Sequence, residues 1–78
     1  MARYHFDISD DTDTRDDEGQ ELNSREQAEA VAVRALAETL LDHPAPLPKV
    51  ISINVRSADE RAASFQIVLR CETVAAGR

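Results

Sequence analysis

The fold class follows from residues 24–42, which read SREQAEAVAVRALAETLLD. An alanine-rich stretch of this length favours a helix directly. Ser24 suits the N-cap, and Gln27 three residues later completes a capping-box pattern. The helix should end at His43, because a residue that precedes proline is pushed out of the helical region. The chain therefore contains one strong helix, and its other apolar segments must cover one face of it.

Three further segments alternate between apolar and polar residues, which is the period of a half-buried strand. They are residues 3–8 (RYHFDI), 50–56 (VISINVR) and 63–72 (ASFQIVLRCE). In the third segment, the alternation predicts that Phe65, Ile67, Leu69 and Cys71 point into the core. The last two strands flank a polar turn at residues 57–61 and should pair as an antiparallel hairpin.

The remaining segments connect or terminate these elements. Residues 9–22 form an acidic loop in which DTDTRD can fold back on the first strand as a short edge strand. Gly19 lets the chain turn before Leu22 enters the core, so residues 16–22 act as a structural lead-in to the helix. Residues 73–78 have nothing to bury and should fray. We expect a single α+β domain, in the order β-(β)-α-β-β, with one helix across a mainly antiparallel sheet of three or four strands.

The net charge of −6 is concentrated in one place. Residues 7–21 hold eight acidic residues and one arginine, a net −7, which leaves seven acidic and eight basic residues, or +1, for the rest of the 78-residue chain. This balance argues against nucleic acid as a partner, since DNA-binding domains are usually basic. A single cysteine, the absence of a signal-peptide pattern and the absence of a membrane-length apolar run predict a cytoplasmic protein without membrane contact.

We weigh three interpretations of the acidic loop, and the calcium site has the least support. A calcium loop counted from Asp7 fails because Thr12 stands where a glycine is needed and Arg15 falls on a ligand position. A solvated loop is tolerable, since neighbouring carboxylates repel one another only weakly in water. A docking surface for a basic protein partner would use the loop's carboxylates, namely Asp10, Asp11, Asp13, Asp16, Asp17 and Glu18.

Catalytic chemistry finds no support in the sequence. His5, His43 and Cys71 form no recognisable catalytic set, and the chain has neither a phosphate-binding glycine loop nor a Cys/His metal spacing. We therefore expect a protein that is not an enzyme and has no catalytic, cofactor or metal site. The open face of the sheet should carry the polar residues Arg3, His5, Ser52, Asn54, Arg56, Gln66, Arg70 and Glu72. Its three arginines are able to contact phosphates or to pair with the acidic loop, and a solvated face is the favoured interpretation.

The helix carries the main functional hint. Its core-facing stripe consists of Ala28, Ala32, Ala35, Leu36 and Thr39, flanked by Val31 and Leu40. A second apolar stripe lies on nearly the opposite side, where a monomer would normally place charge. We call it the outer stripe, and it consists of Ala30, Val33, Ala37 and Leu41. It predicts a protein–protein contact, of which a homodimer is the simplest form.

The combination of RYHFDI, DDEGQEL and EAVAVRALAETL resembles a family of small bacterial proteins of about this length that is classed as a domain of unknown function. The likeness covers essentially the whole chain, although residues 9–11 replace a more usual glycine-containing turn and residues 23–24 replace a Pro-Asp pair at the helix start. It implies no activity and no site residues.

The chain is also distantly similar to the antitoxin domains of bacterial HicB-type toxin–antitoxin pairs, which bind a small basic toxin. The F-P-D-L-P-G-C-type turn of those domains is missing here. This likeness implies an alternative function as an acidic binder of a small basic protein. A nucleic-acid-associated regulator is a further alternative.

Overall fold

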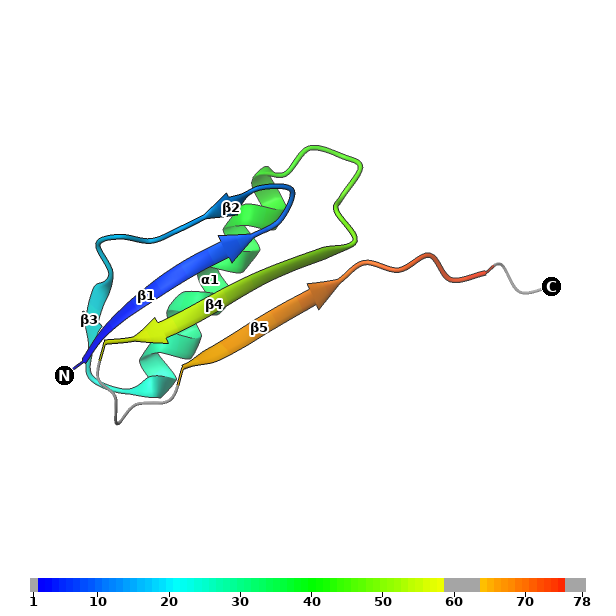
Figure 1. Ribbon diagram of the computed structural model, residues 1–78. Coiled ribbons are helices and arrows are strands. Elements are labelled where there is room, and N and C mark those ends of the chain that lie inside the picture. Colours follow the sequence, from blue (N-terminus) through cyan, green and yellow to red (C-terminus); the bar gives the residue numbers. More distant parts are fainter. Residues whose placement is uncertain (1, 59–63, 76–78) are drawn as a thin grey trace.

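The computed structural model describes residues 2–58 and 64–75, and Figure 1 shows its elements in chain order. The strands are β1 (Ala2–Ser9), β2 (Asp13–Thr14), β3 (Gln20–Leu22), β4 (Val50–Ser57) and β5 (Phe65–Arg70), and the helix is α1 (Arg25–Asp42). Most of the predicted turn at residues 57–61 and the end of the predicted tail, residues 76–78, lie outside the described residues.

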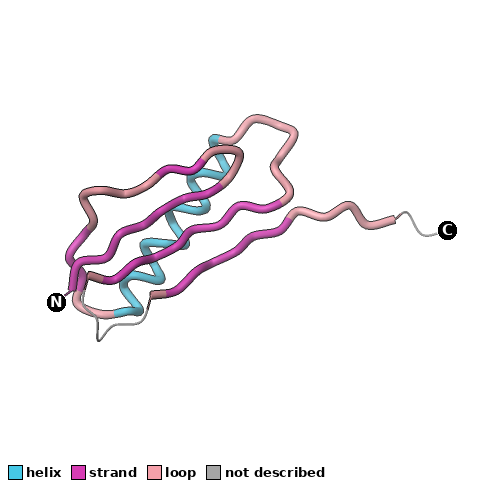
Figure 2. Tube along the Cα trace, viewed as in Figure 1, coloured by secondary structure: helices cyan, strands magenta, loops and turns pink. Residues whose placement is uncertain are grey.

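The strands form one antiparallel sheet with the spatial order β2-β1-β4-β5, and β3 also pairs with β1 (Figure 2). Tyr4 of β1 lies opposite both Gln20 of β3 and Ser57 of β4, so β3 occupies the edge of β1 that faces away from β4. β2 occupies the same edge further along β1. The α+β prediction is confirmed. β2 lies within the predicted edge strand DTDTRD, whereas β3 lies in the segment predicted as a lead-in to the helix and was not predicted.

The ends of α1 follow the capping pattern of the sequence. The Ser24 Oγ accepts a hydrogen bond from the Gln27 N–H at 3.2 Å, and the Gln27 side chain accepts one from the Asn23 N–H at 2.8 Å. At the other end, His43 is the C-cap and its N–H donates to the Leu40 carbonyl at 3.2 Å. These bonds satisfy backbone groups that a helix end otherwise leaves without partners.

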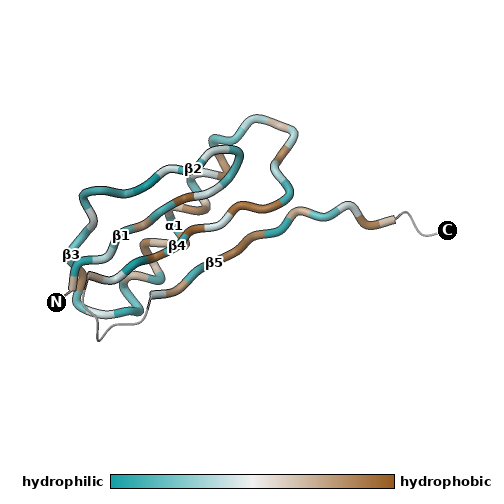
Figure 3. Tube along the Cα trace, in the orientation of Figure 1, coloured by the Kyte–Doolittle hydropathy of each residue, from teal (hydrophilic) through white to brown (hydrophobic). Residues whose placement is uncertain are grey.

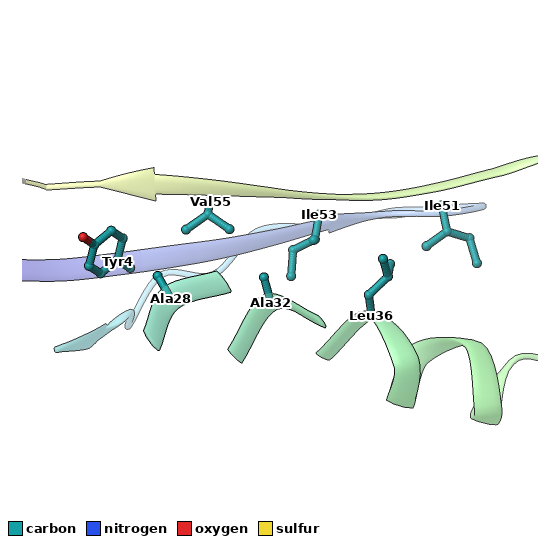
Figure 4. Close-up of a cluster of buried hydrophobic side chains, with 7 residues drawn as sticks. All are labelled: Tyr4, Ala28, Ala32, Leu36, Ile51, Ile53 and Val55. Atoms are coloured by element: carbon teal, nitrogen blue, oxygen red, sulfur yellow. The ribbon is translucent and has the colours of Figure 1, made fainter. Parts of the chain in front are cut away.

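The core lies between α1 and the two central strands. Figure 4 shows side chains of the helix pointing at side chains of β4, with the tyrosine of β1 at one end. The cluster consists of Tyr4, Ala28, Ala32, Leu36, Ile51, Ile53 and Val55, all of them buried. Two of the three helix residues are alanines, so the helix backbone can approach the sheet closely. The predicted core-facing stripe of the helix is therefore confirmed.

The last strand is less buried than its alternation predicts. Leu69 is 36% exposed and Cys71 is exposed, so the prediction that both are buried in the core was wrong, whereas Phe65 and Ile67 pack against the core as predicted. β5 also ends at Arg70, before the predicted end at residue 72. A helix is about 10 Å wide and strands lie about 4.8 Å apart, so one helix covers about two strands. Figure 1 shows α1 behind β1 and β4, with β5 beyond its cover.

Two leucines of α1 provide a test of this core. Leu36 is 5% exposed whereas Leu41 is 84% exposed. Leu36→Ala should lower the free energy of unfolding by about 2–5 kcal/mol because it opens a cavity against the sheet. Leu41→Ala removes the same atoms from the same helix and should change it by less than about 0.5 kcal/mol. Urea unfolding at low protein concentration measures both, and equal losses would contradict the assigned helix orientation.

Candidate functional site

The Asp16 carboxylate closes a gap in the sheet edge. β2 ends at Thr14 and β3 begins at Gln20, so the middle of β1 has no strand partner on that side. There the Asp16 Oδ2 accepts a hydrogen bond from the Phe6 N–H at 3.0 Å, in the place of a strand carbonyl. A backbone donor of β1 that would otherwise lack a protein partner is thereby satisfied.

The second carboxylate oxygen of Asp16 shapes the turn that follows. Its Oδ1 accepts hydrogen bonds from the Glu18 N–H at 3.1 Å and the Gly19 N–H at 3.0 Å. Partial burial alone would raise the pKa of Asp16. The hydrogen bonds from the backbone N–H groups of Gly19, Phe6 and Glu18 outweigh that effect and lower the pKa below its usual value. Asp16 therefore stays ionised as part of the fold.

A bidentate ion pair lies beside Asp16 on the open face of the sheet. The Arg56 guanidinium of β4 donates through Nε and Nη2 to the two carboxylate oxygens of Asp7 on β1. The Asp7 Oδ1 also accepts from the Asp16 N–H at 2.9 Å, and the Arg56 Nη2 donates to the Asp16 carbonyl at 3.1 Å. The hydrogen bonds from Arg56 are the main cause of the lowered pKa of Asp7. Asp7, Asp16 and Arg56 therefore form one network across three segments.

Two other residues of β1 hold the turn after Asp16. The Arg3 Nη1 donates to the Glu18 carbonyl at 2.7 Å, and the His5 Nδ1 lies 3.1 Å from the Asp16 carbonyl. Gly19, at the same turn, has φ +75°. A Cβ there would lie 2.8 Å from the His5 ring and 2.9 Å from the Arg3 Cγ. The glycine is thus required both for its backbone conformation and for the close approach of these side chains.

The acidic residues upstream of Asp16 make local contacts. The Asp10 Oδ1 accepts from the Thr12 N–H at 2.9 Å, which is a turn typical of aspartate. The Asp13 Oδ1 accepts from the Ser9 hydroxyl at 2.7 Å. Apart from the half-buried Asp10 and Asp16, the residues of the predicted docking set are exposed. Sequence reasoning missed the separate role of Asp16, which it grouped with these surface acids.

The acidic loop also reaches the far end of the helix. The His43 Nε2 lies 3.0 Å from the Asp11 Oδ2, and its Nδ1 lies 2.7 Å from the Pro44 carbonyl. The imidazolium form donates from both ring nitrogens, so the Pro44 carbonyl and then the Asp11 carboxylate raise the pKa of His43. This contact ties the turn between β1 and β2 to the C-cap of α1.

The arginines of the open face are engaged within the chain. Arg3 and Arg56 bind the acidic loop, which is one of the two roles the sequence left open for them. Arg70 lies 3.6 Å from Glu72 in an exposed ion pair. Ser52 is buried on this face, because it lies on the central strand β4 between Ser9 of β1 and Val68 of β5. Across residues 2–58 and 64–75, no three His, Cys, Asp or Glu side chains are grouped as metal ligands would be.

The outer stripe of α1 lies where the sequence placed it. Its four residues, Ala30, Val33, Ala37 and Leu41, are all exposed, and the first three follow the helix on the side turned away from the sheet. Val33 is 56% exposed. No helix in the described part of the chain is long and apolar enough to cross a bilayer.

Replacement of Gly19 tests the turn. Gly19→Ala places a Cβ against His5 and Arg3 and forces a left-handed backbone on alanine. The backbone strain alone should lower the free energy of unfolding by about 1–2 kcal/mol. The double variant Gly19→Ala/His5→Ala relieves part of the crowding and should lose less stability than the sum of its single changes. A Gly19→Ala variant as stable as the parent in urea unfolding would contradict this assignment.

The role of Asp16 predicts that the stability of the fold depends on pH. The pKa of Asp16 is lower in the folded state than in the unfolded chain, where it is about 4. The ionised carboxylate therefore stabilises the fold above about pH 4, and this stabilisation is lost as the pH falls through the pKa of the folded state. Asp16→Asn should lower the free energy of unfolding by about 1–3 kcal/mol at pH 7, because the amide cannot accept all three N–H groups equally well. The gap to the parent should shrink below pH 4.

Asp17→Asn is the matched control, since it makes the same chemical change one residue away at an exposed side chain. Its effect on the free energy of unfolding should be within about 0.5 kcal/mol at both pH values. If urea unfolding shows the same decrease in the free energy of unfolding for both variants, the network around Asp16 does not stabilise the fold.

Comparison with known proteins identifies a family but no function. A family model described as Domain of unknown function (DUF6894) matches residues 3–72, which run from the second residue of β1 to just beyond β5. No curated protein and no solved structure matches the chain. The predicted resemblance to a family of unknown function is confirmed, while the similarity to HicB-type antitoxins stays a hypothesis. Because the match covers most of the 78 residues, the chain belongs to the DUF6894 family.

Proposed function

We propose that this chain is a non-enzymatic protein–protein interaction domain that self-associates. The observation that carries the proposal is the outer stripe of α1, where Val33 and Leu41 are 56% and 84% exposed. Exposed apolar side chains are common one at a time, but a contiguous stripe on a helix is typical of a contact surface. The buried polar network around Asp16 supports the same view, because it stabilises the loop rather than presenting reactive groups.

A second copy of the chain is the simplest partner for the outer stripe. Two helices that meet along small residues such as Ala30 and Ala37 can approach closely, and Val33 and Leu41 then fill the contact between them. The same surface patch serves both copies, as a two-fold dimer requires. Burial of these side chains also adds apolar area that a chain of 78 residues otherwise lacks.

The acidic docking alternative has less to support it. Asp16, the best-positioned carboxylate of the predicted set, already accepts three backbone hydrogen bonds. Its replacement would disturb the fold as well as any docking. A basic partner is therefore better sought with the exposed Asp17, whose loss leaves the network around Asp16 intact.

Single substitutions in the outer stripe test self-association. Val33→Glu and Leu41→Glu each place a charge in the proposed contact and should convert the chain to a monomer while its circular dichroism spectrum stays unchanged. The control is Gln27→Glu, which adds the same charge to the same helix outside the stripe and keeps a capping-box side chain. Sedimentation equilibrium gives the mass of each variant.

Each possible result of the outer-stripe experiment leads to a different conclusion. Monomeric stripe variants beside a dimeric Gln27→Glu variant support the helix as the contact. A dimer that persists in both stripe variants excludes this surface and leaves the sheet as the site of association. A parent chain that is monomeric at every concentration contradicts the proposed function.

A further inference from the structure

Strand β5 is the one long, regular free edge of the sheet. The order β2-β1-β4-β5 leaves it at the end of the sheet, and its pairing with β4 runs without a break from Phe65 to Arg70. Edge strands are usually protected by proline, bulges or charges along their length. β5, which reads FQIVLR, has no proline, no bulge in its register and a single charge at its last residue.

The register shows which backbone groups face outward. The Cys71 N–H donates to the Lys49 carbonyl at 2.8 Å, so residues 65, 67, 69 and 71 direct their hydrogen-bonding groups at β4. The pairing of β4 with β1 gives the same assignment. The Ala58 N–H donates to the Arg3 carbonyl at 2.9 Å, so the even-numbered residues of β4 direct their hydrogen-bonding groups at β1 and the odd-numbered residues direct theirs at β5. The N–H and C=O groups of Gln66, Val68 and Arg70 therefore point away from the sheet.

At the centre of this edge, one apolar side chain is exposed on each face of the sheet. Val68 is 48% exposed on the open face, and Leu69 is 36% exposed on the helix face. Phe65 is covered by the Arg25 guanidinium, 4.8 Å from the ring centroid, and Ile67 is half-buried against the core, whereas Val68 and Leu69 are exposed. Figure 3 shows hydrophobic colouring in the middle of β5, with hydrophilic colouring toward both ends of the strand.

We propose that β5 pairs antiparallel with β5 of a second copy, centred on Val68. This inference rests on the proposed self-association, and names a second surface for it apart from the outer stripe. Outward-pointing residues must face one another, so Val68 lies opposite Val68 of the other copy and Gln66 lies opposite Arg70. On the helix face, Ile67 lies opposite Leu69. No like charges meet directly, whereas a shift by two residues places Val68 opposite the charged Arg70 or the polar Gln66.

The charge distribution favours a second copy at this edge. The acidic loop pairs with β1 at the other side of the sheet, three strand positions from β5. In the proposed dimer, the two loops lie seven strand spacings apart, or about 34 Å. The Debye length at physiological salt is about 8 Å, so their mutual repulsion is screened. Association at the opposite edge would instead bring together two copies of residues 7–21, each with a net charge of −7.

The two-fold axis of this pairing is perpendicular to the sheet, so both helices lie on the same face of one continuous sheet. The outer stripes of both copies remain exposed in this arrangement. The two surfaces are therefore compatible, and each can be tested while the other is intact.

Val68 variants test the strand contact. Val68→Lys places two lysines opposite each other at the centre of the pairing, and Val68→Pro removes an N–H that points away from β4. Both variants should keep their fold by circular dichroism and lose the β5 contact by sedimentation equilibrium. The product is a monomer if β5 is the sole contact, and a dimer through the outer stripe if both surfaces associate. Val74→Pro is the matched control, since Val74 is exposed beyond the end of β5, and it should keep the association state of the parent chain. If Val68→Pro fails to fold, Val68→Lys alone decides.

Gln66 tests the register. Gln66→Glu creates two opposite-charge pairs with Arg70 of the other copy and should lower the dimer Kd by about 2- to 30-fold, whereas Gln66→Lys should raise it by a similar factor. Equal effects of the two changes, or an assembly whose mass both Val68 variants leave unchanged, would overturn the proposed pairing.

Comparison with the outer-stripe variants separates the two proposals. Loss of the dimer in Val33→Glu and Leu41→Glu but not in Val68→Lys overturns the strand contact and leaves the proposed function standing. The reverse pattern supports the strand contact and overturns the helix contact. A larger assembly that each set of variants reduces to a dimer supports both surfaces, and a strictly monomeric parent chain overturns both.

Discussion

The width of one α-helix limits how much of this sheet can be buried. α1 covers β1 and β4, so Ile51, Ile53 and Val55 of β4 lie in the core, while the margins of the sheet must be managed by other means. At one margin the acidic loop folds back and supplies hydrogen bonds to β1. At the other, β5 retains half-buried and exposed apolar residues. Both edges differ from the centre of the sheet for the same reason, which is that a single helix is too narrow to cover them.

One carboxylate of the acidic loop, that of Asp16, helps to hold the fold together. A carboxylate offers several acceptor sites, and the Asp16 side chain uses them for three backbone N–H groups from β1 and its own turn. Arg56 and Asp7 complete the network from the open face. The remaining carboxylates stay near the surface, where water and salt weaken their repulsion. A local net charge of −7 is thus compatible with an ordered loop.

Sequence periodicity and capping were sufficient to predict α1, the three main strands and the layer arrangement, because these depend on local propensity and on which face is apolar. The exposure of Leu69 and Cys71 was missed, because alternation reports the face on which a side chain lies but not whether another element covers it. The role of Asp16 was missed because its partner on β1 is distant in sequence. Its spacing to Gly19 was a usable signal, since aspartate commonly accepts N–H groups two and three residues ahead.

The interrupted edge beside β1, where β2 and β3 pair with a gap between them, limits how many copies of the chain can join one sheet. A sheet with two equivalent open edges can add copies at both and extend into a fibre, whereas a sheet with one open edge can close only in pairs. Here the carboxylate at residue 16 occupies the backbone donor that a further strand would need, and the flanking strand pieces, β2 and β3, are two and three residues long. The break in the strand therefore blocks pairing at this edge, so the proposed pairing through β5 would stop at two copies.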